Sequence, residues 1–346
     1  MMQVQINDCT IRDGGYLLAK NPSSGYVSGV FSGLLAGGVD VIEIGFLQKV
    51  VGGESVVYVN EVEAGRHMPP SGSPSRFTGF CDNSRYSLDL LGDCDGGAFE
   101  YLKISFAKHE RAEALAFVEG AKAKGYKVFA NPMDAPSYDR EERAQMMEEI
   151  NRIKPYCFSI VDTFGTMYLD DLDQVFSQMD EGLDRDVRIG LHSHNNLQLS
   201  NALAERMIDL AAAADRDIVV DSSLYGMGRG AGNAATEVIA SFLNERYDAH
   251  YDLGVLLDTI DEYVAPLDGK VRWGYDLPML ACGTLGAHVD NVFHMRELGE
   301  RSSRRQYEVI AALEPPQRKR YGSGYSKSDF SLLDAAIEEM GANGGE

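Results

Sequence analysis

The 346-residue sequence lacks several features that mark particular classes of protein. Its 32 lysines and arginines are outnumbered by 53 aspartates and glutamates, for a formal charge of −21. Nucleic acids and anionic membranes attract basic surfaces, so this balance argues against both as partners. No stretch approaches the roughly 20 apolar residues of a membrane span, and the N-terminus has neither the basic nor the apolar region of a signal peptide.

Cysteine is scarce as well, with five in the chain, an odd number, and no Cys-x-x-Cys pair. Widely spaced single cysteines favour reduced thiols over a disulfide framework, so we expect a cytoplasmic protein. Hydrophobic residues still make up 44% of the chain, which is enough for a sizeable core. The cysteines are Cys9, Cys81, Cys94, Cys157 and Cys282.

Histidine is rare too, with seven in the whole chain, yet two of them lie close together in the segment 188–196 (RIGLHSHNN). The segment has the pattern of a buried strand that runs into a loop. Because strand side chains alternate between faces, His192 and His194 project to the same side. Such a pair can share a metal ion, or it can be two hydrogen-bonded core histidines, which are more common. The two asparagines that follow favour the metal.

The chain as a whole alternates short apolar strands with helices, the later strands about 30 residues apart. This repeat is typical of βαβ crossovers and a parallel sheet. Eight units predict an α/β fold of the (β/α)8 TIM-barrel type over residues 1–250, with the active site at the carboxyl ends of the strands. An open doubly wound sheet is the alternative. The predicted strands are 3–8, 39–47, 76–81, 99–107, 127–132, 157–164, 188–196 and 217–224.

Residues 251–346 break this rhythm. They contain predicted helices at 253–264 and 279–297 and a charged, glycine-rich tail. We therefore expect a helical C-terminal region packed on the barrel.

The first strand ends in Asp8-Cys9-Thr10-Ile11-Arg12-Asp13-Gly14-Gly15, and the glycines predict a loop. Asp13 supplies the oxygen ligand that a pair of histidines lacks, and two histidines with one carboxylate leave positions open for water and substrate. Arg12 offers a permanently charged fork for a carboxylate or an enolate. The alternative is a surface turn in which both side chains are solvated.

Three further polar residues lie on predicted strands or at their ends. Glu43 faces the barrel axis if Ile42 and Ile44 face the helices, and it then needs a partner. Lys103 points inward by the same alternation, which raises the possibility of Schiff-base chemistry, although we favour a structural ion pair. Thr163 follows the sixth strand and can bind a substrate carboxylate or cap a helix.

A glycine-rich run follows the eighth strand, at 226–233 (GMGRGAGN). As a phosphate-binding loop it is weak, because no Lys-Ser/Thr follows it. It fits better as a mobile loop that closes over the mouth of a barrel, with Asn233 able to reach the metal.

Three motifs together resemble the DRE-TIM metallolyase superfamily, which includes hydroxymethylglutaryl-CoA lyase, isopropylmalate synthase and 4-hydroxy-2-oxovalerate aldolase. They are Asp-x-Thr-x-Arg-Asp-Gly after the first strand, His-x-His-Asn after the seventh, and GAGNA-x-x-E after the eighth. Their order and spacing agree over residues 5–240. The loop SLYGMGRGAGNAATE, which lacks the cysteine of the CoA lyases, and the segment around Trp273-Gly274-Tyr275 are most similar to the hydroxy-oxo-acid aldolases.

The resemblance implies roles for individual residues. Asp13, His192 and His194 would bind a divalent metal ion, with Asn233 a possible fourth ligand, and Mn²⁺ or Mg²⁺ would be preferred over Co²⁺ or Zn²⁺. Arg12 would stabilise an enolate, and Thr163 would bind the substrate carboxylate. The aldolases carry a histidine three residues after the metal-binding aspartate, and this chain has Tyr16 there. Tyr16, Tyr275 and a metal-bound water therefore remain alternatives for the catalytic base.

The sequence thus predicts a metal-dependent aldolase that converts a 4-hydroxy-2-oxo acid to a pyruvate-type 2-oxo acid and an aldehyde through a metal-bound enolate. We expect these small molecules, and further copies of the chain in a homo-oligomer, to be its partners. One alternative is a Claisen-type enzyme acting on an acyl-CoA. The other is a non-catalytic metal-binding barrel, which the replacement of the family histidine by Tyr16 would favour.

Overall fold

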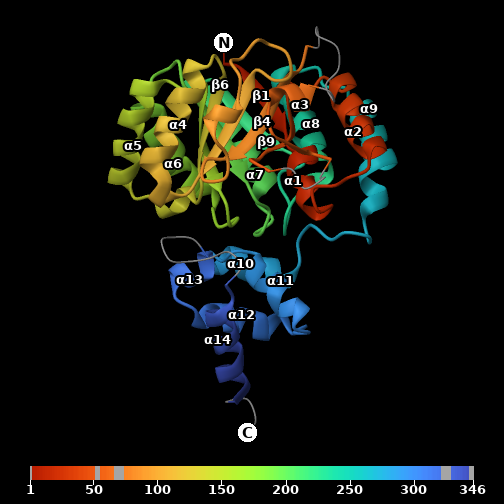
Figure 1. Ribbon diagram of the computed structural model, residues 1–346, viewed down its shortest axis with the longest axis vertical. Coiled ribbons are helices and arrows are strands. Elements are labelled where there is room, and N and C mark those ends of the chain that lie inside the picture. Colours follow the sequence, from red (N-terminus) through yellow and green to blue (C-terminus); the bar gives the residue numbers. More distant parts are fainter. Residues whose placement is uncertain (1, 51–54, 66–73, 321–328, 343–346) are drawn as a thin grey trace.

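A closed barrel of eight parallel strands forms the larger part of the molecule (Figure 1). The computed structural model describes residues 2–50, 55–65, 74–320 and 329–342. β1 pairs with β9 on one side and β2 on the other, which closes the ring, and the short strand β3 (Val57–Tyr58) pairs with the end of β2. The barrel strands are β1 (Val4–Asp8), β2 (Val41–Leu47), β4 (Arg76–Asp82), β5 (Tyr101–Phe106), β6 (Lys127–Pro132), β7 (Cys157–Asp162), β8 (Arg188–Ser193) and β9 (Ile218–Ser222). The predicted TIM-barrel fold is confirmed.

Helices cover the outside of this barrel because each has one apolar face. In α6 (Leu169–Gly182) the buried residues Leu172, Val175, Phe176 and Met179 follow the spacing of an amphipathic helix. The other covering helices are α2 (Ser24–Ala36), α4 (Arg111–Ala123), α5 (Arg140–Ile153), α7 (Ser200–Ala214) and α8 (Thr236–Tyr247), with the short α3 (Glu61–Gly65) beside β3.

The segment after β1 is a helix, α1 (Thr10–Leu17), where the two glycines predicted a loop. A Cβ atom at Gly14 would lie 3.0 Å from the Sδ of Met227, so the helix can pack against the loop after β9 only because this side chain is missing. Tertiary packing here outweighs the low helix propensity of glycine. As a result, Arg12 and Asp13 are buried rather than solvated.

The C-terminal helices α10–α14, called the C-terminal unit below, have a hydrophobic core of their own. The single helix predicted at 279–297 is two helices, because the chain turns at Gly286 with a positive φ of 61°. Where the structure describes it, the charged, glycine-rich tail is largely helical, in α12, α13 and α14, and 321–328 and 343–346 lie outside the described residues. The helices are α10 (Leu277–Leu285), α11 (Asp290–Glu297), α12 (Ser303–Ala312), α13 (Pro315–Lys319) and α14 (Ser331–Ala342).

The boundary between the two units stays a prediction. Leu256 in α9 (Leu253–Thr259), with Ile260 and Val264 in the π-helical turn that follows it, belongs to the hydrophobic core of the barrel rather than to that of the C-terminal unit. We therefore propose that the barrel extends beyond residue 250, to the turn Ala265–Leu267.

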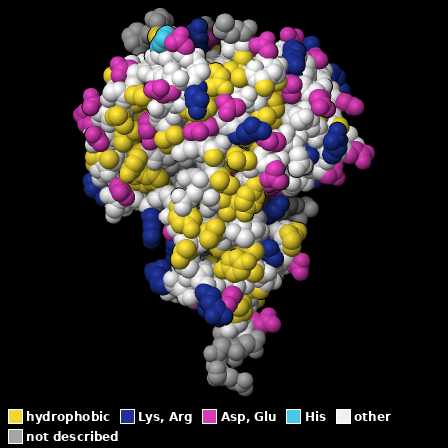
Figure 2. Space-filling model, turned by 180° about the vertical axis from the view of Figure 1, so that it is seen from behind, with side chains coloured by type: hydrophobic (Ala, Val, Ile, Leu, Met, Phe, Trp, Pro, Cys, Tyr) yellow, Lys and Arg dark blue, Asp and Glu magenta, His cyan; other side chains and the backbone are white. Residues whose placement is uncertain are grey.

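The C-terminal unit faces the carboxyl ends of the strands (Figure 1). Asn196, just after β8, donates a hydrogen bond to the carbonyl of Met279 (3.0 Å), and Lys319 pairs with Asp134 after β6 (2.7 Å). In Figure 2 acidic side chains spread over the barrel, and hydrophobic ones gather toward the C-terminal unit. No helix in the described part of the chain is long and apolar enough to cross a membrane.

Candidate active site

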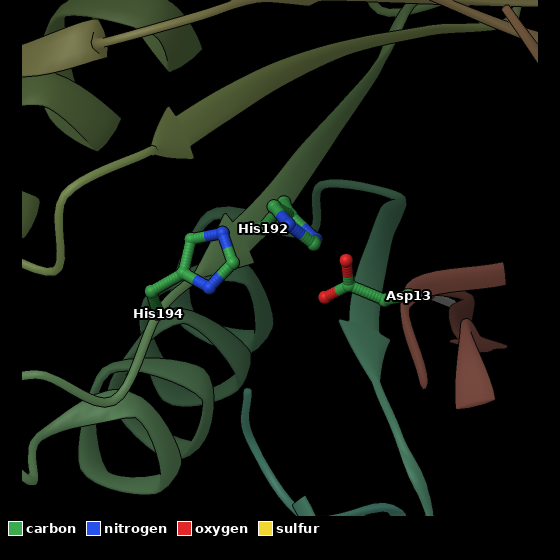
Figure 3. Close-up of side chains that lie close together, drawn as sticks. All are labelled: Asp13, His192 and His194. Atoms are coloured by element: carbon green, nitrogen blue, oxygen red, sulfur yellow. The ribbon is translucent and has the colours of Figure 1, made fainter. Parts of the chain in front are cut away.

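Two histidines and an aspartate meet at the carboxyl ends of the barrel strands. His192 lies on β8, His194 follows that strand directly, and Asp13 lies on α1 behind β1. Each offers one ligand atom, and these atoms lie within 4.8 Å of one another. Figure 3 shows the three side chains directed toward a common space. The parallel barrel brings them together because β1 and β8 both flank β9.

The protonation states of these groups suit a cation. Burial, reinforced by His192, lowers the pKa of His194 to about 4, so its imidazole is neutral at physiological pH. Burial raises the pKa of Asp13, but Arg12 and both histidines outweigh it and hold this pKa below its ordinary value. A neutral imidazole and an ionised carboxylate are the forms that coordinate metal ions.

Asn233, from the glycine-rich loop, contacts the same carboxylate. Its Nδ2 donates a hydrogen bond of 2.7 Å to Oδ2 of Asp13. Its Oδ1 is buried and has no hydrogen-bond partner among the described residues. Gly228 leaves room for this contact, because a Cβ there would lie 2.8 Å from Asp13 Oδ2. An orphaned amide oxygen on a side chain that contacts the Asp13 carboxylate fits a divalent metal ion.

The loop 226–233 itself is packed rather than exposed. Met227 and Ala231 are buried, and Arg229 forms an ion pair with Asp290 at the start of α11. The backbone of Gly230 also accepts a hydrogen bond from Gly274. These contacts favour a fixed wall of the site over the mobile loop predicted from the glycines.

Arg12 lies beside the three potential ligands. Its Nη1 is 2.9 Å from Oδ1 of Asp13, and its Nε is 2.6 Å from Oε2 of Glu43. Its guanidinium also lies over the ring of Phe80, with Cζ 4.5 Å from the ring centre. These contacts fix the arginine at the edge of the cavity, while Glu43 lies fully buried behind it. Glu43 does not line the cavity and contacts the site through Arg12.

The cavity in front of these residues has a volume of about 540 Å³. Tyr16 and Thr163, which the sequence placed at the active site, line this cavity. Tyr275 is 43% exposed and is not among the lining residues, which argues against its candidacy as the base. The phenylalanines in the lining are Phe46, Phe80, Phe164 and Phe293.

Several lining residues were missed by the sequence analysis. Ser105 and Asn131 lie at strand ends, and the alternation that placed Lys103 inward could have identified Ser105 on the same face of β5. Arg229 lies within the glycine-rich run, and His288 comes from the C-terminal unit. No local signal marks His288, because it reaches the cavity only through the packing of the C-terminal unit on the barrel.

Comparison with known families adds to this geometry. The model of the HMGL-like family matches residues 101–262, the part of the barrel that carries the His-x-His motif. Over this segment the chain is similar to the HMGL-like family. The other half of the site, Arg12 and Asp13, lies on this protein's first strand–helix unit, outside the matched segment.

Two relatives that align over most of the chain bear the same name. The chain is 25% identical over 314 residues to the 4-hydroxy-2-oxovalerate aldolase of Roseiflexus sp. (strain RS-1), an alignment that covers 86% of each chain. It is also 25% identical over 350 residues to the enzyme of that name from Geobacillus genomosp. 3, covering 99% of this chain and 98% of the other. The predicted resemblance to the DRE-TIM metallolyases is confirmed.

The fold also recurs among solved structures. The N-terminal domain of a putative aldolase from Bacteroides vulgatus superimposes with a TM-score of 0.71 at 23% identity, over 84% of this chain and 96% of the other. The comparison supports the barrel assignment.

Proposed function

We propose that the protein is a divalent-metal-dependent aldolase that cleaves or forms the C–C bond between a pyruvate-type 2-oxo acid and an aldehyde. The observation that carries this proposal is the convergence of Asp13, His192 and His194 within 4.8 Å at the cavity, with Arg12 beside them. The 4-hydroxy-2-oxovalerate aldolases to which the chain is similar make a 4-hydroxy-2-oxo acid the natural class of substrate.

The ligands would be Asp13, His192 and His194, with Asn233 completing the set if its amide turns over. Oxygen and imidazole donors suit Mn²⁺ or Mg²⁺, and Co²⁺ or Zn²⁺ are also compatible. When bound, the ion supplies Lewis-acid activation of the 2-oxo group. The chain's own residues provide orientation, charge and protons.

Arg12 stabilises the enolate oxygen that develops when the C–C bond breaks. The guanidinium is permanently charged and buried, and Glu43 and Asp13 hold it in one orientation. A donor fixed in advance at the position where negative charge develops lowers the barrier without reorganisation.

Thr163 binds the substrate carboxylate. Its Oγ1 accepts a hydrogen bond of 2.8 Å from the backbone N–H of Asp134, which fixes the side chain at the cavity wall. Its own hydroxyl hydrogen then remains available to donate to a carboxylate oxygen. Asp162 beside it points elsewhere, because its two oxygens accept backbone N–H groups of the following turn.

Tyr16 is the side chain placed to handle the proton of the aldehyde oxygen. Its ring packs against Phe46 and under the guanidinium of Arg229, which lies 5.5 Å from the ring centre. Burial raises the pKa of its hydroxyl, so the phenol keeps its proton at neutral pH. Tyr16 Oη can therefore donate that proton to the aldehyde oxygen as the C–C bond forms.

Schiff-base chemistry at Lys103 is not supported. The ammonium group forms ion pairs with Glu43 and Asp221, and Lys103 does not line the cavity. Burial lowers its pKa, but the two carboxylates outweigh this and raise it, so the amine is not available as a nucleophile. The predicted structural ion pair is confirmed.

Exchange of the methyl protons of pyruvate tests the proposal directly, because it requires only enolisation and no knowledge of the aldehyde. In D₂O with Mn²⁺, we expect the protein to deuterate pyruvate, and chelation to stop the exchange. Absence of exchange with pyruvate and other 2-oxo acids, despite bound metal, would favour the non-catalytic barrel.

A further inference from the structure

We propose that Lys103 is a positioning residue that couples the metal-binding histidine to the enolate-stabilising arginine. The inference rests on the proposed function, and it assigns a role to a buried ion network that the cavity does not expose. The network joins the inner faces of several strands beneath the site.

Lys103 lies at the centre of this network. From β5 its Nζ lies 2.6 Å from Oδ2 of Asp221 on β9, and it also pairs with Glu43 on β2. Asn7 on β1 donates hydrogen bonds of 2.7 Å to both carboxylates. All four side chains are at most 5% exposed. Strand alternation directs them to the barrel axis, where side chains from different strands form one packed layer.

The first branch of the network leads to Arg12. Glu43 uses one carboxylate oxygen for Lys103 and Asn7, and the other for Nε of Arg12 at 2.6 Å. With Lys103 on one oxygen, the carboxylate plane is fixed and the second oxygen faces the arginine. The orientation of the guanidinium thus depends on the lysine.

The second branch leads to His192. Asp221 Oδ2, which pairs with Lys103, also lies 3.0 Å from Nδ1 of His192. Nδ1 makes no hydrogen bond among the described residues, so the contact is a close approach that sets the carboxylate beside Nδ1 and leaves Nε2, on the other side of the ring, for a metal. Carboxylates in this position orient metal-binding histidines, and their loss typically weakens metal binding about 10–100-fold.

Lys103 also offsets the negative charge of the layer. Glu43 and Asp221 are two carboxylates within a region almost closed to water, and Lys103 pairs with both. Removal of the lysine makes this buried region more negative by one charge, which is costly unless the remaining groups move. Arg12 is the nearest cation that can compensate, and it would do so by leaving its position beside Asp13.

The test uses isosteric variants with two separate readouts. Mn²⁺ affinity of the metal-free protein, measured by calorimetry without substrate, reports the His192 branch. The rate constant of pyruvate deuteration at saturating Mn²⁺ reports the Arg12 branch. We expect Asp221→Asn to weaken Mn²⁺ binding about 10–100-fold. We expect Glu43→Gln to lower the exchange rate constant about 10²-fold with Mn²⁺ affinity kept.

Lys103→Met should lose both Mn²⁺ affinity and exchange rate, and adding Asp221→Asn to it should weaken Mn²⁺ binding no further.

The matched control is Lys127→Met, a half-exposed lysine at the opposite end of the neighbouring strand β6. A folded Lys103→Met protein with unchanged Mn²⁺ affinity and exchange rate would overturn the proposal. If Lys103→Met does not fold, Asp221→Asn and Glu43→Gln provide the test. Loss of both Mn²⁺ affinity and exchange rate in each of these variants would refute the assignment of one branch to His192 and the other to Arg12. If the unmodified protein shows no exchange, the proposed function fails, and the Mn²⁺ affinities still decide the His192 branch.

Discussion

The side-chain amide of Asn233 donates a hydrogen bond of 2.7 Å to the carboxylate of Asp13, although 220 residues separate them in the chain. The contact joins the loop after the last strand to the helix after the first. It depends on the absence of a side chain at Gly228.

Substitution of Gly228 should therefore damage the metal site without touching a ligand. In Gly228→Ala the new methyl group would displace Asn233 and Asp13, so we expect Mn²⁺ affinity to fall at least about tenfold. Calorimetric titration of the metal-free protein measures this. Gly25→Ala is the control, since no atom lies within 4 Å of a Cβ there. Equal affinity of Gly228→Ala and unmodified protein would show that the contact is dispensable.

Removal of either histidine should remove the metal and leave the barrel folded. We expect His192→Ala and His194→Ala to retain little metal after dialysis, with unchanged far-ultraviolet circular dichroism, because each loses a ligand that lines the cavity and neither belongs to the hydrophobic core. Metal content is measured by elemental analysis, with the exposed His109→Ala as control. A variant that keeps a full equivalent of metal and full activity would contradict the assignment.

Arg12→Lys should lower the rate constant of pyruvate deuteration about 10²–10³-fold. Lysine keeps the charge but cannot contact Glu43 and Asp13 at once as the guanidinium does. Arg76→Lys, a half-exposed arginine at the start of β4, serves as control. Retention of the full rate by Arg12→Lys would mean that charge alone suffices.

Tyr16→Phe and Tyr275→Phe distinguish the two tyrosines that the sequence left as alternatives. Loss of a general acid typically costs at least about 10² in rate, so we expect Tyr16→Phe to lower the rate of aldol condensation by this factor. Tyr275→Phe should have little effect, because its side chain does not line the cavity. The opposite pattern would assign the proton transfer to Tyr275.

Stability should depend on pH through Asp162. Burial raises the pKa of this carboxyl to about 6, against its backbone hydrogen bonds. A raised acid pKa means that the folded state holds its proton more tightly, so the contribution to stability is full below about pH 4 and is lost as pH rises through 6. We expect the stability of the unmodified protein relative to Asp162→Asn to fall by up to about 3 kcal/mol between pH 4 and pH 7.

Urea denaturation of the metal-free proteins at several pH values measures this difference. Asp8, whose pKa burial also raises to about 6, is present in both proteins, and its effect cancels. A difference that is constant with pH would show that Asp162 titrates normally in the folded protein.

The sequence alone determined the barrel and half of the site. Strand periodicity is a local property, so eight apolar runs with helices between them predict the strands within a few residues. The carboxyl ends of parallel strands meet at one edge, so polar residues that follow them meet as well. Asp13, His192 and His194 could therefore be placed together before any contact was known.

Only the tertiary structure decided the rest, because it depends on contacts between distant segments. Gly14 lies in a helix that packs closely on Met227 from a distant loop, and Lys103 is an ion-pair centre because Glu43 and Asp221 come from other strands. The same reason explains why His288, which no sequence pattern marked, lines the cavity, whereas Tyr275, a candidate base, does not. The docking of the C-terminal unit on the barrel directs His288 to the cavity and leaves Tyr275 outside it, and no local pattern encodes that docking.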